Sequence, residues 1–120
     1  MSTREVVVLA GTRTAIGDYG GMLKDMAPTK LGAIAIKEAV ARAKIDPASI
    51  GHVVMGSVIH GEARDMYLSR VAAIDAGLPV GTPCLTVNRL CGSGLQAIVS
   101  AAQHICSATP TAWSAAARRA

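Results

Sequence analysis

Phenylalanine is absent from the 120 residues, and one tryptophan and two tyrosines are the only large aromatic side chains. The core must therefore be built from valine, isoleucine, leucine, methionine and alanine. The net charge of +4 is modest, and no run of lysine and arginine interrupts the body of the chain. Nucleic-acid surfaces combine basic clusters with aromatic residues, so we expect no nucleic-acid partner and at most a weak attraction for an anionic cofactor.

The sequence also lacks metal-ligand spacing and long apolar runs. Its three cysteines, Cys84, Cys91 and Cys106, form no C-x-x-C pair and no zinc-type pattern. The first apolar run, residues 6–9, is too short for the apolar region of a signal peptide with its cleavage site, and no apolar run is long enough to span a bilayer. These absences predict a cytoplasmic, reduced protein with no metal, no bound cofactor and no membrane contact.

The residues that are present suit a small packed α/β unit, since 51% of them are apolar. Strands are predicted at residues 5–10, 52–59 and 83–87. Helices are predicted from Pro28, over residues 67–77 and directly after Cys91. Three strand–helix units in a row (βαβαβα) predict a parallel sheet with right-handed crossovers, and the first strand is expected to be buried on both faces.

The third predicted strand leads into Cys91. The helix after it is predicted from an apolar face formed by Leu95, Ile98, Val99 and Ala102. Cys91 would then lie at or just before a helix N-terminus, where unpaired N–H groups favour a thiolate. Gly92 and Gly94 leave room for an acyl group. From the residues alone, Cys91 is equally well explained as an activated nucleophile or as a small buried side chain.

Two other stretches could carry chemistry. The loop over residues 11–28 is rich in glycine, but its spacing fits neither a P-loop nor a dinucleotide fingerprint, which favours a structural loop. His60 follows the second predicted strand and could serve as a general base. No second histidine lies at ligand spacing from it, so an ordinary loop histidine is the preferred interpretation.

The segment N-R-L-C-G-S-G-L-Q-A, residues 88–97, resembles the nucleophile segment of thiolases, the family of acetyl-CoA acetyltransferases and β-ketothiolases. The resemblance runs from about residue 4 to 105 and includes R-T-A-I-G at 13–17, the glycine pair at 20–21 and R-D-M-Y at 64–67. It implies that Cys91 is the acyl-thioester nucleophile of an acetyl-CoA C-acyltransferase that condenses acyl-CoA or cleaves 3-ketoacyl-CoA. It further implies CoA thioesters as substrates, a homo-oligomer and a place in fatty acid metabolism.

The resemblance also implies that only part of a thiolase is present: an incomplete N-terminal half with its final strands missing, over residues 1–105. Residues 106–120 show neither periodicity nor a glycine turn. With G/C-ending codons, a reading frame shifted by one base turns this tail into Leu-Leu-Gly-Asp-Ala-Asp, which is similar to the family. We therefore expect 106–120 to be a frameshifted tail, which the gene's DNA sequence would test.

The family's other reactive groups lie in G-H-P, C-x-G and N-E-A-F motifs, and the 120 residues contain none of these. The chain alone is therefore expected to be inactive. Three alternatives remain open: a non-catalytic fragment that pairs with an intact thiolase, a related ketoacyl synthase-type condensing enzyme, and a thiol-redox protein. The acyl chain length and the direction of the reaction are not predicted.

Overall fold

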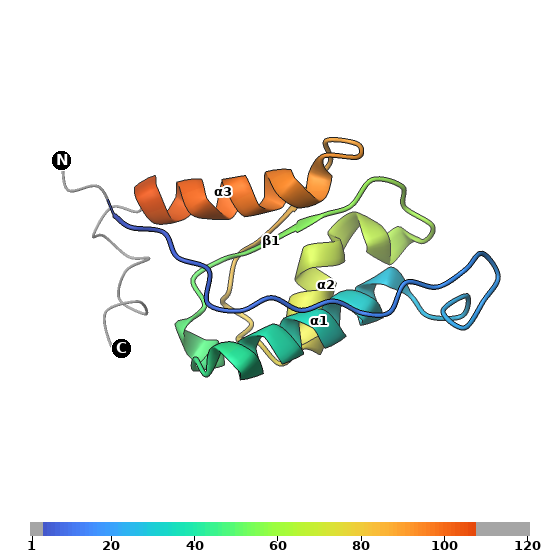
Figure 1. Ribbon diagram of the computed structural model, residues 1–120, viewed down its shortest axis with the longest axis horizontal. Helices are drawn as coiled ribbons and strands as arrows, with labels where there is room; N and C mark the ends of the chain where they lie inside the picture. Colours follow the sequence, from blue (N-terminus) through green and yellow to red (C-terminus); the bar gives the residue numbers. More distant parts are fainter. Residues whose placement is uncertain (1–3, 108–120) are drawn as a thin grey trace.

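The computed structural model describes residues 4–107, and Figure 1 shows them as three layers. The middle layer is a pair of parallel strands, β1 (Val53–Gly56) and β2 (Cys84–Val87), aligned so that Val53 faces Cys84. Helix α3 (Ser93–Ser107) covers one face, whereas α1 (Pro28–Ala43) and α2 (Leu68–Asp75) cover the other. The predicted α/β class with parallel strands is confirmed. No helix in residues 4–107 is both long and apolar enough to cross a membrane.

Helix α1 begins at Pro28, as its sequence predicts. Pro28 occupies the first turn, where a missing N–H costs nothing, and Lys44 closes the helix in the left-handed conformation with φ 54°. The close contact with α2 depends on Gly32, because a Cβ there would lie 3.1 Å from Ala72 Cβ. The apolar residues Leu31, Ile34, Ala35 and Ala39 predict one buried stripe on this helix, which is wrong at Ile34 because that side chain is 50% exposed.

Helix α2 is shorter than the predicted span 67–77, because 3₁₀ turn η2 (Ala63–Tyr67) precedes it. Gly77 ends it as predicted, with φ +89°, a conformation that glycine adopts without strain. A second 3₁₀ turn, η1 (Pro47–Ser49), lies between α1 and β1. The core joins β1 to the end of α2 through Val53, Ala73 and Leu78, and this packing fixes the two strands that lead to the candidate site.

The prediction of a buried strand at residues 5–10 was wrong. This segment carries no strand pairing, and Val8 in its centre is 86% exposed. A groove of about 750 Å³, almost entirely apolar, is lined by residues 6–12 on one side and by β1, α1 and α3 on the others. Strands hydrogen-bond only at about 4.8 Å separation, so a segment held across a groove cannot join the sheet.

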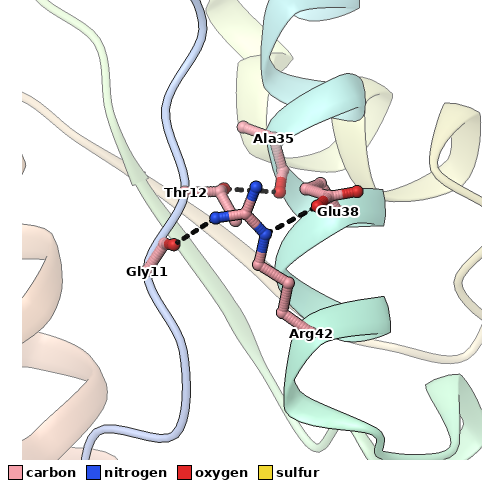
Figure 2. A network of polar contacts seen from close by, with 5 residues as sticks. All are labelled: Gly11, Thr12, Ala35, Glu38 and Arg42. Atoms are coloured by element: carbon pink, nitrogen blue, oxygen red, sulfur yellow. Dashed lines mark hydrogen bonds and ion pairs between the residues drawn. The ribbon is translucent and has the colours of Figure 1, made fainter.

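Side chains, rather than a backbone ladder, hold this N-terminal segment to the helices. Thr12 Oγ1 donates a hydrogen bond of 3.0 Å to the Ala35 carbonyl oxygen (Figure 2). Arg42 reaches across from α1, with Nη1 3.4 Å from the Gly11 oxygen and Nε paired with Glu38 at 2.6 Å. The segment therefore lies along α1 without forming a third strand.

Candidate functional site

Cys91 is exposed and lies four residues after β2 and two residues before α3. Pairing of the two strands continues to their carboxyl ends, where Ser57 N donates to the Val87 oxygen at 3.0 Å. Ligands of open parallel sheets collect at this edge. The structure therefore places Cys91 at the surface near this edge of the sheet, and its side chain is not part of the core.

The turn around Cys91 has an unusual conformation. Leu90 has φ 47°, which side chains other than glycine and asparagine rarely adopt. Gly92 N donates to the Arg89 oxygen and Ser93 N to the Leu90 oxygen, both at 3.0 Å. The result is a tight reversal that turns the chain from β2 into α3 and leaves Cys91 on its outer side.

Ser93 fastens this turn from within. It is 3% exposed, and its Oγ accepts a hydrogen bond from Arg89 N at 2.8 Å and donates one to the Leu90 oxygen at 2.6 Å. The Leu90 oxygen thus accepts two hydrogen bonds from Ser93, one from its hydroxyl and one from its backbone N–H. The hydroxyl thus links the start of α3 to the residues that precede the cysteine.

The first turn of α3 rests directly on the backbone of β1. A Cβ added to Gly56 would lie 2.7 Å from Ser93 C and 2.9 Å from Gly94 N. Gly56 therefore sets how close the start of α3 comes to the sheet. By contrast, nothing lies within 4 Å of a Cβ added at Gly94, which lines the apolar groove. A Cβ at Gly92, next to Cys91, would lie 3.4 Å from the Arg89 oxygen.

The surroundings of Cys91 favour negative charge. The backbone N–H groups of Gly94 and Leu95 find no backbone acceptor among residues 4–107, as is usual in the first turn of a helix. Arg89 adds a cation, and its Nη1 is held over α3 by Gln96 Oε1 at 3.2 Å. Dipole and guanidinium both favour an anion at this end of the helix.

The other candidate residues lie apart from this turn. His60 is exposed and forms no hydrogen bond with any described residue. Cys84 is partly buried in β2, and its Sγ lies 3.5 Å from the Thr82 oxygen. Cys106 is exposed in the last turn of α3, at the opposite end from Cys91. Within the described part of the chain, no group of three or more His, Cys, Asp or Glu could hold a metal.

Sequence reasoning did not single out the histidine pair at the far end of α3. His52 and His104 stack with ring centroids 4.3 Å apart, and His52 Nε2 is buried without a hydrogen-bond partner in the structure described. Burial, and secondarily the charge of His104, holds the pKa of His52 below its ordinary value of 6.5. The pair joins β1 to α3 and does not contribute to the cysteine turn.

Sequence reasoning also missed the structural role of Asn88 inside the recognised segment. Its Oδ1 accepts a hydrogen bond from Leu90 N at 3.0 Å, and its Nδ2 donates one of 3.0 Å to the Val58 oxygen. The available signal was the identity of the residue itself, because asparagine often bonds to the backbone N–H two positions later and so builds turns.

Comparisons with known proteins agree with the residue-level resemblance. The family model for "Thiolase, N-terminal domain" matches residues 6–112. The chain is 64% identical over 103 residues to beta-ketothiolase BktB of Cupriavidus necator, an alignment that covers 86% of this chain and 26% of that protein. It is 45% identical over 103 residues to human mitochondrial 3-ketoacyl-CoA thiolase, with the same coverage of each chain.

Solved structures give the same result. The crystal structure of human mitochondrial 3-ketoacyl-CoA thiolase in complex with CoA matches with a TM-score of 0.80 at 44% identity, over 82% of this chain and 25% of that one. The acetyl-CoA acetyltransferase of Bacillus anthracis matches with a TM-score of 0.79 at 37% identity, over 83% and 25%. The chain thus spans about a quarter of the length of these relatives. Because the family model matches most of its residues and the fold agrees, the chain belongs to the thiolase family and carries part of the N-terminal domain.

Proposed function

We propose that Cys91 is the acyl-accepting thiol of an acetyl-CoA C-acyltransferase, and that this chain supplies the part of the enzyme that carries it. The observation that supports the role is the placement of an exposed sulfur at the anion-favouring start of α3, beside the carboxyl ends of both strands. In the first step the thiolate attacks the carbonyl carbon of an acyl-CoA. The carbon–sulfur bond to CoA breaks, and CoA leaves as a thiolate that takes up a proton.

The second half of the reaction needs an acid or base that moves a proton α to a thioester. No G-H-P, C-x-G or N-E-A-F motif occurs in the 120 residues, and His60 is not bonded to any described residue near the cysteine. We therefore propose that the chain alone performs neither condensation nor thiolysis. CoA thioesters are the proposed substrates of the assembled site, and a cytoplasmic location remains a prediction.

Competitive alkylation tests the reactive thiol. The chain is treated with iodoacetamide at neutral pH, in an amount too small to label every thiol, and the peptides of Cys91 and Cys106 are compared by mass spectrometry. Both thiols are exposed and belong to opposite ends of the α3 region, so Cys106 is the internal control. We expect Cys91 to be labelled faster, because the start of a helix stabilises a thiolate and its end does not. Equal labelling of the two cysteines would remove the activated-thiol argument.

A second function, pairing with an intact thiolase without catalysis, is favoured by the apolar surface that the chain exposes. Leu95 and Ile98 on α3 are 67% and 63% exposed, although they belong to its predicted apolar face. The groove beside them is also apolar. Burial of such surface is the main driving force of protein association. Co-purification of the chain with a full-length thiolase would support this function, and its absence at high concentrations of both proteins would contradict it.

A further inference from the structure

The left-handed conformation of Leu90 requires a compensating interaction, and Asn88 supplies it. For a leucine, φ 47° is strained because its Cβ approaches the following carbonyl group. Asn88 Oδ1 accepts a hydrogen bond of 3.0 Å from Leu90 N. This bond offsets part of the strain of the left-handed conformation. Asparagine side chains commonly stabilise such turns.

Asn88 is itself fixed from the other side of the site. Its Nδ2 donates to the Val58 oxygen at 3.0 Å, in the loop that follows β1. One amide group therefore connects the loop after the first strand to the turn after the second. Ser93 closes the same turn from α3, through its bonds to Arg89 N and the Leu90 oxygen.

We propose that Asn88 is a positioning residue that holds Leu90 in the left-handed conformation and so keeps Cys91 at the start of α3. This inference rests on the proposed role of Cys91, because a turn needs to be held here only if the sulfur must stay beside the helix N-terminus. Asn88 does not take part in the chemistry. Asn88 acts indirectly, by fixing the backbone conformation of residues 89–91.

The test measures two properties of the full chain: the ratio of Cys91 to Cys106 alkylation at neutral pH, and the hydrogen exchange of the Leu90 amide by NMR. In Asn88→Ala we expect faster exchange at Leu90 and a fall in the alkylation ratio of about two- to fivefold, the effect of removing a helix N-terminus from an anion. The Leu78 amide, which donates to the Ala73 oxygen, should exchange as before. The helical circular dichroism should stay unchanged, because the turn lies outside α3.

Two further variants separate positioning from general damage. Asn88→Ser keeps an oxygen that can accept the Leu90 N–H and lacks the donor to Val58, so it should restore both readouts to within about twofold of the original chain. Leu90→Gly removes the strain of the left-handed conformation. In that background, adding Asn88→Ala should change the alkylation ratio by less than about twofold.

The outcomes are distinguishable. Unchanged Leu90 exchange in Asn88→Ala overturns the inference, and so does Asn88→Ser behaving like Asn88→Ala. An undiminished effect of Asn88→Ala in the Leu90→Gly background also overturns it. If Cys91 in the unaltered chain reacts no faster than Cys106, the proposed function fails instead, and the exchange of the Leu90 amide still decides whether Asn88 holds the turn.

Discussion

Substitution of Gly56 by alanine should displace the start of α3 and thereby test the geometry of the site. The added methyl group would lie 2.7 Å from Ser93 C, 2.8 Å from its oxygen and 2.9 Å from Gly94 N. Ordinary contacts are about 3.5 Å, so the helix must move by about 0.6–0.8 Å. All three obstructing atoms are backbone, so no side-chain rotation can relieve the overlap.

Overpacking of this kind costs about 1–3 kcal/mol. For a domain of this size, each kcal/mol lowers the melting temperature by about 4–8 °C. Thermal and urea unfolding followed by circular dichroism would measure the loss of stability. The alkylation ratio of Cys91 to Cys106 should also fall, since the displaced helix start no longer lies in the same position relative to the sulfur.

Gly51→Ala is the matched control, because Gly51 lies just before β1 and a Cβ there meets nothing within 4 Å. Its effect on the free energy of unfolding should stay within about 0.5 kcal/mol. If Gly56→Ala were as stable as Gly51→Ala and left the alkylation ratio unchanged, the close contact between β1 and α3 would not exist in solution.

Substitutions at two further positions test interactions that lie apart from the cysteine turn. Because the pKa of His52 is lowered on folding, the unfolded chain takes up a proton before the folded chain does as the pH falls below 6.5. The stabilising contribution of the neutral His52 should therefore be complete above pH 6.5, decline below it and level off under the lowered pKa. Urea midpoints measured across this pH range should show the decline, and His52→Gln should abolish it. Asp65 in η2 is 2% exposed, and its carboxylate accepts hydrogen bonds from Gly61 N at 2.9 Å and Glu62 N at 3.0 Å. Asp65→Ala should lower the free energy of unfolding by about 1–3 kcal/mol, and Asp65→Asn by less. Equal urea midpoints for the original chain and both variants would show that these two hydrogen bonds contribute nothing to stability.

Single residues in the sequence predicted the helix boundaries that depend only on local backbone conformation. Pro28 fixed the start of α1, and Gly77 fixed the end of α2, because each residue has a conformation that suits only that position. The position of Cys91 before α3 followed from the spacing of the apolar residues after it. The resemblance to thiolases, carried by residues 88–97, was confirmed by the family match.

Features that depend on distant partners were not predictable in the same way. Residues 5–10 have the composition of a buried strand, but a strand exists only where a neighbour can bond to it, and β1 lies across a groove. Likewise, Gly56 and Ser93 are 37 positions apart, and nothing in the sequence indicates that one rests on the other. Asn88 lay within the recognised motif, yet its bond to Val58 depends on how two strands are aligned.

The weak attachment of the N-terminal segment has a consequence for the tendency of the chain to aggregate. Its hydrogen bonds to the helices are a few side-chain contacts, at Thr12, Arg42 and, near the far end of α3, between Arg4 Nη1 and the Ile105 oxygen at 3.3 Å. Because these contacts are few, we expect the segment to detach at a lower free energy than the strand pair and its helices need to unfold. We expect such an opening to expose the apolar residues of β1, α1 and α3 that line the groove, and so to promote association of chains that are otherwise still folded.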